Sequence, residues 1–506
     1  MRILRLGNLF MRPFKTAAIL LITAALTSCT VGPAFRRPPP PAVNAYTATA
    51  LPEKTQSALV SGGSPQLFKL GENIPARWWT LFNSPALDRL EQTALTRNHT
   101  LAAAKEALNE ADEIERSQEG ALLYPKVDAS ASAERQKFSG AAFGQPGAPG
   151  IIFNLFNASA SVSYIFDIFG GSRRQLEALE AQTDYQRFQF EGAYIALTAN
   201  IVTTAVKEAS LRARIAATAE ILSDQQKQLK IVEKQLALGG VSRSDVLAQR
   251  TQVAQTRATL PPLEKELSQT RHQLNVLAGV LPGHPGAAQL PEFGLDGLAL
   301  PKDLPVSLPS SLVRQRPDIR ASEALLHGAS AQIGVATASM LPEFTFKGSL
   351  GTETTRASDL FGKNTSIWNL GMSLLAPFFH GGELTEKRRA AISAYKQALA
   401  QYQETVLEAF QNVADVLRAI DRDAATLNAQ TQAWAAARDS LDITRGQFRL
   451  GAVSYLQLLN AQRQYQQAQI NLVQARAARF ADTVALFQAL GGGWWDRPTG
   501  PLAEGK

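Results

Sequence analysis

The segment Phe448-Arg449-Leu450-Gly451-Ala452-Val453-Ser454 lies between two long helical patterns that contain no proline. Apolar side chains recur at every seventh position on both sides of it, at Leu427, Trp434, Leu441 and Phe448 before it and at Leu458, Tyr465 and Leu472 after it. A seven-residue apolar repeat places one stripe on one face of a helix and favours supercoiling against a neighbouring helix. The stretch therefore predicts a long helical hairpin that turns at Gly451.

The same pattern occurs 212 residues earlier, which is the spacing between Gly239 and Gly451. The repeat there runs through Ile215, Leu222, Leu229 and Leu236, then Val246, Val253 and Leu260. The turn Leu238-Gly239-Gly240-Val241-Ser242 corresponds to Leu450-Gly451-Ala452-Val453-Ser454. A register that is kept across two distant segments, with the turns in step, favours internal duplication over two unrelated coiled-coil segments.

Each half of the chain also has two segments of alternating polarity ahead of its hairpin. In the first half we expect strands within 126–169, joined by the loop Ser139–Gly150. In the second half we expect strands from Glu343 to Leu350 and from Ile367 to Phe378. One face of each pair is apolar, as shown by Phe156, Ala158, Ala160, Val162, Tyr164, Phe166 and Ile168, and by Trp368, Leu370, Met372 and Leu374. Such alternation predicts strands with two unlike faces.

The hairpin helices have clear start and break signals. Gly170-Gly171 and Gly381-Gly382 precede the two long helices, and a single helix from Ser172 to Leu238 would be about 100 Å long. Pro261-Pro262 is expected to break the first returning helix, because proline has no backbone donor. The Pro- and Gly-rich stretch Leu281–Pro309 is expected to link the two halves.

The N-terminus carries an export signal. Arg12 and Lys15 precede an apolar run, Ala17–Leu26, that is too short to span a bilayer. Leu26-Thr27-Ser28-Cys29 follows and resembles a bacterial lipobox, in which the cysteine accepts a diacylglycerol; by the same resemblance, Thr30 favours the outer membrane. An ordinary secretory signal with a stray cysteine is the alternative. We therefore expect a signal peptide at 1–28, a lipid-anchored tether and equatorial segment at 29–95, repeat 1 at 96–300, repeat 2 at 301–491 and a tail at 492–506.

The composition excludes several other classes of protein. With 45% hydrophobic and 19% charged residues, the 506-residue chain is neither disordered nor a polytopic helical membrane protein. Its charge of +7 falls to +3, 47 basic against 44 acidic residues, without the four basic residues before Cys29, so we expect no nucleic acid partner. The histidines, at positions 99, 272, 284, 327 and 380, show no metal-ligand spacing. We expect no enzymatic activity, no metal, and no cofactor other than the covalent lipid on Cys29.

Four amphipathic strands cannot form a closed barrel in a membrane. A sheet that faces lipid must leave no open edge, and transmembrane barrels begin at about eight strands. Several chains must therefore pool their strands. The same oligomer would gather the long hairpins into a helical tube, which suits conduction.

The chain resembles the TolC-like outer-membrane efflux factors, in their NodT/OprM-like lipoprotein branch. The residues that carry the resemblance are Trp78-Trp79-Thr80-Leu81-Phe82, Arg316-Pro317-Asp318-Ile319-Arg320-Ala321-Ser322-Glu323, Leu459-Asn460-Ala461-Gln462-Arg463 and Leu490-Gly491-Gly492-Gly493-Trp494. The resemblance implies a mixed α and β membrane protein: a homotrimer with a 12-stranded outer-membrane β-barrel continuous with a 12-helix periplasmic tunnel. It also implies a periplasmic adaptor (membrane fusion protein), an inner-membrane efflux pump of the RND type, and a passive exit duct through outer-membrane lipid.

The resemblance assigns roles to two groups of residues. The hairpin tips, Leu238 to Ser242 and Leu450 to Ser454, would contact the adaptor, although their glycines also suit a tight turn without any partner. The periplasmic aperture would be formed by Leu456, Asn460 and Arg463. Asn460 stands where the family has an acidic residue and cannot form an ion pair with an arginine, so a charge-pair latch would need Asp245 or another carboxylate. A solvated helix face is the alternative for Arg463.

Two other motifs and two other functions remain open. Arg316-Pro317-Asp318 suits the start of a helix, and Trp78-Trp79 suits packing or anchoring at a membrane interface. A periplasmic adaptor lipoprotein would carry one hairpin within a small β-domain, whereas this chain has two hairpins. A non-conducting coiled-coil envelope scaffold would leave the alternating strands unexplained.

Overall fold

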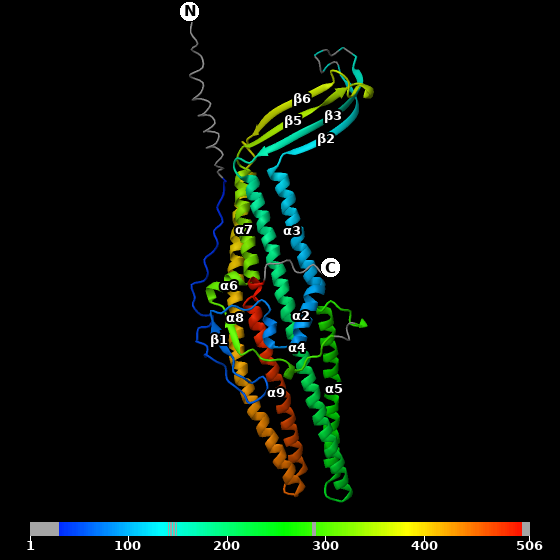
Figure 1. Cartoon of the computed structure of the whole chain (residues 1–506), viewed down its shortest axis with the longest axis vertical. Coiled ribbons are helices and arrows are strands. Elements are labelled where there is room, and N and C mark those ends of the chain that lie inside the picture. Colours follow the sequence, from blue (N-terminus) through cyan, green and yellow to red (C-terminus); the bar gives the residue numbers. More distant parts are fainter. Residues whose placement is uncertain are drawn as a thin grey trace, which may run out of the picture. The chain divides into compact units, whose positions relative to one another are not determined.

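The computed structural model describes residues 30–497 except 140, 142–143, 145–146, 148 and 286–289 (Figure 1). The predicted signal peptide, Cys29 and the last part of the predicted tail lie outside these residues. The chain divides into two compact units. The first contains residues 1–37, 108–185 and 322–402, and the second contains 38–107, 186–321 and 403–506.

Four antiparallel strands form the sheet of the first unit, in the order β2-β3-β5-β6 (Figure 1). Their bounds are β2 Lys126–Phe138, β3 Ile151–Phe166, β5 Glu343–Thr354 and β6 Ser366–Leu375. The predicted strands are confirmed, but β3 starts before Phe156 and ends before Ile168, and β5 extends past Leu350. Strand β6 ends at Leu375 rather than Phe378, because Pro377 has no N–H to continue the ladder.

The register gives this sheet one apolar and one polar face. Val127 lies opposite Val162, Val162 opposite Gly348, and Gly348 opposite Leu370. The neighbouring row runs through Asp128, Ser161, Ser349 and Asn369. Because directly paired residues point to the same side of a sheet, the rows alternate between an apolar and a polar face. Trp368, Leu370, Met372 and Leu374 are each more than half exposed on the apolar face.

The first described residues lie along the helices of the first unit. The Val31 N–H donates to the carbonyl of Phe169 at 3.0 Å, and the Arg174 guanidinium donates to the Val31 carbonyl at 3.1 Å. Phe35 stacks on His327 with ring centroids 4.4 Å apart, and Arg37 pairs with Glu323. The extended tether is thus fastened to α4 (Gly171–Ala237) and α7 (Pro317–Ala338).

The second unit contains the ends of both predicted hairpins. Helices α4 and α8 (Glu383–Arg449) have 67 residues each, and the returning helices α5 (Arg243–Leu277) and α9 (Tyr455–Ala489) have 35 residues each. Figure 1 shows α4 with α5 in green and α8 with α9 in yellow to red. The equal lengths confirm the duplicated hairpins, which begin where glycine pairs were predicted to open them. No described helix is both long enough and apolar enough to cross a membrane.

The second unit has an aromatic core. Trp78, Trp79 and Phe82, from the 3-10 turn η1 (Trp78–Phe82), are buried. Trp78 and Phe82 lie against Phe487 of α9, Phe82 also against Phe480, and Trp79 packs on Trp78. Of the two interpretations for Trp78-Trp79, the structure therefore supports packing. These aromatic contacts hold α9 to η1, which α2 (Pro85–Arg97) follows in the chain.

The predicted helix start at Arg316-Pro317-Asp318 is confirmed. Pro317 is the first residue of α7, where its missing N–H costs no hydrogen bond. The Arg316 guanidinium donates to both Asp318 carboxylate oxygens, at 3.0 and 2.6 Å, and to the carbonyl of Ala489 at 2.9 Å. Arg316 thereby joins the beginning of α7 to the end of α9, where helix carbonyls have no partner within the helix.

One sequence-based expectation is wrong. Helix α5 is continuous through Pro261-Pro262, although the carbonyls four residues before each proline lose their donors. Buried residues on both sides of the prolines, Val253 and Leu263 among them, keep the helix packed and outweigh that loss. The stretch that was expected to link the two halves has secondary structure of its own. It contains β4 (Asp303–Val306), which pairs in parallel with β1 (Leu67–Leu70), and leads into α6 (Pro309–Gln315).

Candidate functional site

The tip of the first hairpin is built from local hydrogen bonds. Gly239 has φ +78°, and its N–H donates to the Leu236 carbonyl at 3.0 Å. The Gly240 N–H donates to the Gln235 carbonyl at 2.8 Å, which completes a Schellman motif at the end of α4. Ser242 then caps α5, because its hydroxyl accepts the Asp245 N–H while the Asp245 carboxylate accepts the Ser242 N–H at 2.9 Å.

The second tip repeats these bonds. Gly451 has φ +74° and donates to the Phe448 carbonyl at 3.0 Å, while the Ala452 N–H donates to the Gln447 carbonyl at 2.9 Å. Ser454 caps α9 together with the Gln457 side chain. Both tips therefore reverse the chain without any partner protein, and they leave Leu238 and Leu450 each 86% exposed. Two exposed leucines at the ends of preformed turns offer apolar contacts to a second protein.

The predicted aperture residues share one face of α9. Leu456, Asn460 and Arg463 are spaced four and three residues apart and are all exposed, Leu456 by 62%. Asp245 lies at the start of α5, in the other hairpin, where its carboxylate accepts the Ser242 N–H and hydroxyl at 2.9 and 2.7 Å. The structure thus groups the first three residues and gives Asp245 a separate role in the first tip.

One contact between the hairpins was not anticipated. The Tyr455 hydroxyl of α9 donates to Gln249 Oε1 of α5, and both side chains are buried. Tyr455 belongs to an apolar cluster that includes Val232, Leu441 and Leu458. Burial raises the pKa of Tyr455, and the nearby Asp245 carboxylate raises it further. In the sequence, the signal for this contact is the aromatic residue Tyr455 next to the cap Ser454. Its partner, Gln249, could not be predicted because it depends on the register between the two hairpins.

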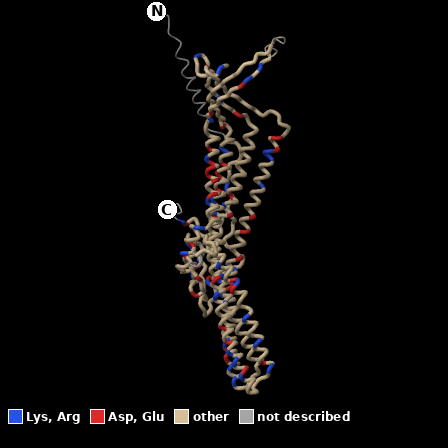
Figure 2. The backbone as a smooth tube through the Cα atoms, turned by 90° about the vertical axis from the view of Figure 1, so that its right-hand side faces the viewer, with Lys and Arg blue, Asp and Glu red and all other residues tan. Residues whose placement is uncertain are grey.

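Basic and acidic side chains are interspersed near the hairpin ends of the second unit. Figure 2 shows Lys and Arg interspersed with Asp and Glu towards the ends of the hairpins in the second unit. Arg250 of α5 pairs with Glu233 of α4 at 2.8 Å, and Arg445 lies 3.7 Å from both Asp224 and Asp442. Mixed signs of this kind give local pairing rather than a strong field of one sign.

Replacing Gly239 by alanine should weaken the first tip, whereas Gly240→Ala should not. An added Cβ at Gly239 meets nothing within 4 Å, so its cost comes from the left-handed backbone, about 1–2 kcal/mol. Gly240 has no positive φ, and its nearest contact would be an ordinary 3.5 Å. Hydrogen exchange of tip amides should accelerate about tenfold in Gly239→Ala only. Equal protection in both variants would contradict the assigned turn.

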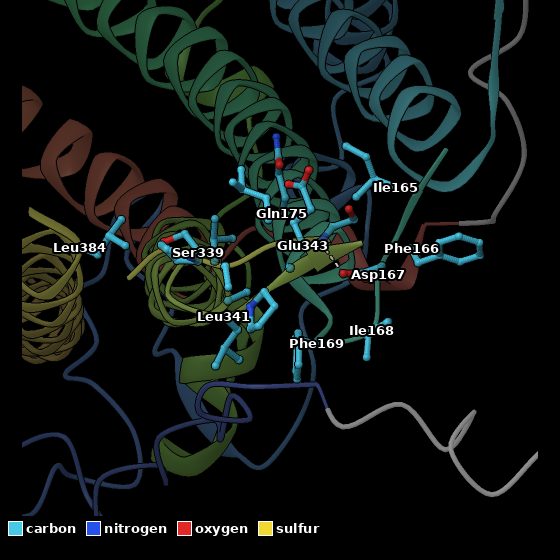
Figure 3. A pocket seen from close by; sticks show the side chains of 18 of the residues that line it. Ile165, Phe166, Asp167, Ile168, Phe169, Gln175, Ser339, Leu341, Glu343 and Leu384 are labelled. Carbon is cyan, nitrogen blue, oxygen red and sulfur yellow. Dashed lines mark hydrogen bonds between the residues drawn. The ribbon is translucent and has the colours of Figure 1, made fainter. Parts of the chain in front are cut away.

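A cavity of about 540 Å³ lies within the first unit, where the strands meet the helices (Figure 3). Its lining is mainly apolar and includes Ile165, Phe166, Ile168 and Phe169. Its lining has two carboxylates, Asp167 and Glu343. Asp167 accepts the N–H groups of Ser172 and Arg173, both at 3.0 Å, and thereby caps α4. Among the described residues no cluster of three or more metal-ligating side chains occurs.

A two-faced strand sheet and long duplicated hairpins define the class of outer-membrane channels with a helical extension. Comparison with known proteins gives the particular family. The family model described as "Outer membrane efflux protein" matches residues 90–280 and 308–492. This chain belongs to that outer-membrane efflux protein family.

Individual relatives agree with this assignment. The pyoverdine export outer membrane protein OpmQ of Pseudomonas aeruginosa is 33% identical over 428 residues, which cover 83% of this chain and 87% of that protein. Nodulation protein T of Rhizobium leguminosarum bv. viciae is 29% identical over 486 residues, covering 96% and 94%. The solved outer-membrane channel OprN is 27% identical, with a TM-score of 0.81 over 92% of this chain and 100% of its own.

These findings confirm the main predictions from sequence. The chain has the TolC-like channel fold with its mixed α and β architecture, and it acts in the outer membrane as an efflux exit duct. The family consists of channels that operate with adaptors and inner-membrane pumps, so membership confirms that the protein is not an enzyme. The adaptor-lipoprotein and scaffold alternatives are thereby set aside.

Proposed function

We propose that three copies of this chain form one passive duct, with a 12-stranded barrel in the outer membrane and a helical tunnel in the periplasm. Four strands per chain give twelve in a trimer. The duct takes what an inner-membrane pump of the RND type delivers through a periplasmic adaptor. Our proposed division of the chain remains 1–28, 29–95, 96–300, 301–491 and 492–506.

The observation that carries this proposal is the two-faced sheet with open edges. Strands β2 and β6 are the outer strands of the described sheet, so each has one side of unpaired backbone groups. In hydrocarbon an unpaired backbone group costs several kcal/mol. Pairing β2 of one copy with β6 of the next removes both edges and directs the polar rows, such as that of Asn369, into a lumen.

The hairpin tips and the first turns of α9, which directly follow the second tip, have separate roles in this proposal. The tips, Leu238 to Ser242 and Leu450 to Ser454, contact the adaptor through exposed leucines held on rigid turns. The aperture is narrowed by Leu456, Asn460 and Arg463. A ring of asparagines is neutral, so closure there depends on packing and hydrogen bonds rather than on a charge-pair latch.

The native mass of the detergent-solubilised protein, corrected for bound detergent, tests the trimer. We expect the mass of three chains. A monomer or dimer would provide four or eight strands and would refute the twelve-stranded barrel. Single-channel conductance of the purified protein in a planar bilayer then tests the duct itself, and a trimer that never conducts in the presence of adaptor would refute conduction.

Cys29→Ala should remove the lipid anchor but leave the protein in the outer membrane. The anchor supplies attachment only, since one or two acyl chains do not span a bilayer, whereas the barrel has its own apolar belt. Mass spectrometry should show the loss of the acyl mass, while extraction should still require detergent. Full solubility of the variant without detergent would mean that the sheet does not face lipid.

A further inference from the structure

A cavity of about 260 Å³ lies between the two hairpins in the second unit. Helix α4 contributes Glu220, Ile221, Asp224 and Gln225, α8 contributes Arg438, Leu441, Asp442 and Arg445, and α9 contributes Gln462, Tyr465 and Gln469. It is thus bounded by side chains of three helices, and it is separate from the exposed face of α9 that carries Leu456, Asn460 and Arg463.

Buried acceptors without donors distinguish this cavity. Gln225 is only 3% exposed and Gln462 only 7%. The Oε1 atoms of Gln225, Gln462 and Gln469 are buried and accept no hydrogen bond from any described residue. Leaving a buried polar atom unpaired costs about 1–3 kcal/mol, so three such oxygens around one space indicate an occupant that donates hydrogen bonds.

The charges around the cavity favour a cation. Its lining has three carboxylates, Glu220, Asp224 and Asp442, and two guanidinium groups. Arg445 lies 3.7 Å from Asp224 and from Asp442. Arg438 lies over the Trp434 ring at 5.0 Å and donates to Asp439 at 3.2 Å. The lining keeps an excess of one negative charge, and an anion would meet three carboxylates and the three unpaired glutamine oxygens there.

We propose that this cavity binds a small organic cation with several N–H donors, of the amidinium or diamine class. Its N–H groups donate to the amide oxygens of Gln225, Gln462 and Gln469, and its charge faces Glu220. Charge-assisted hydrogen bonds of this kind are about twice as strong as neutral ones. Water alone would satisfy the oxygens without using the excess negative charge.

Binding at this place ties the two hairpins together. Gln225 belongs to α4 of the first hairpin, and Gln462 and Gln469 belong to α9 of the second. Direct hydrogen bonds between the hairpins here are few; for example, the Tyr455 hydroxyl donates to Gln249, and Gln225 Nε2 lies 3.4 Å from Gln466 Oε1. A bound cation adds short bonds across this boundary, so it stabilises the arrangement of hairpins seen here and acts as an effector rather than as cargo.

Calorimetric titration of the detergent-solubilised full chain with benzamidine hydrochloride tests the site. The matched neutral ligand is benzamide, which has the same ring but no charge. We expect saturable binding of one benzamidinium per chain, and benzamide about tenfold weaker. Equal affinity for both ligands, or no saturable binding, would overturn the proposal and leave a water-filled cavity.

Three substitutions locate the binding. Gln462→Leu should weaken benzamidinium about tenfold because it removes an acceptor, and Glu220→Gln about threefold because that carboxylate is exposed. Gln469→Leu provides a second acceptor variant where Gln462→Leu disturbs packing. Glu233→Gln is the control: Glu233 lies on α4, like Glu220, but outside the cavity, so this variant should bind benzamidinium as the parent does. Loss of binding in Glu233→Gln, or unchanged binding in both leucine variants, would contradict the site.

Discussion

Leu370→Arg is expected to abolish assembly in the outer membrane. Leu370 is 67% exposed in β6 and lies opposite Gly348 in the apolar row of the sheet. An arginine at the middle of a lipid-facing strand costs about 2–4 kcal/mol in each chain, and a symmetric trimer incurs that cost in every copy. The yield of detergent-extracted, trimeric protein from outer membranes should fall to background, while the unassembled chain accumulates in the periplasm.

The adjacent residue supplies the control. Asn369 lies opposite Ser349 in the polar row, so Asn369→Arg directs its charge into the proposed lumen and should leave the trimer yield close to that of the parent. The two substitutions differ by one position and introduce the same side chain. Equal yields for both variants would mean that neither face meets lipid, and the barrel interpretation would be lost.

Local chemistry explains why the hairpins were predictable. Gly239 and Gly451 each supply a left-handed residue, and Ser242 and Ser454 each supply a cap, so the turns can be read from a few neighbouring letters. The strands were equally predictable, because alternation with a period of two gives each strand one apolar and one polar face, whichever strand pairs with it. Only the strand ends, which depend on residues such as Pro377, differ from the predicted ends by a few positions.

Tertiary packing explains the features that could not be predicted from the sequence. The prolines of α5 are strong local breakers, but the buried stripe that continues through Val253 and Leu263 outweighs them. Strand β4 is four residues long and includes Pro305, so it lacks any alternation to detect. It forms because β1, from a distant part of the chain, pairs with it.

The candidate functional residues also differ in how far local sequence predicts them. The turns at the tips follow from local chemistry, whereas the role of the tips in adaptor contact and the choice of the aperture residues follow from family resemblance. The contact of Tyr455 with Gln249 and the cavity at Gln225 depend on how one hairpin is offset against the other. No repeat within a single helix carries that information.

The buried carboxyl group of Glu91 is expected to make the stability of the folded chain depend on pH. Glu91 of α2 is 0% exposed, and neither of its carboxylate oxygens has a partner among the described residues. Burial raises the pKa of Glu91 well above its ordinary value of 4.5, and the Asp88 carboxylate raises it further. The folded chain therefore keeps a proton that the unfolded chain releases. Stability from this group is fully present below pH 4.5 and is lost as pH rises through the folded pKa.

Glu91→Gln should therefore raise the unfolding temperature at pH 8 and change it little at pH 4.5. Glutamine cannot ionise, so the variant avoids the penalty of an unsatisfied buried charge, on the order of 1–3 kcal/mol or more. Thermal unfolding followed by near-ultraviolet circular dichroism across this pH range measures the difference. Glu404→Gln, at an exposed position of α8, should stay within about 0.5 kcal/mol of the parent at both pH values. A lower unfolding temperature for Glu91→Gln at pH 8 would mean that Glu91 is charged and paired in the assembled channel.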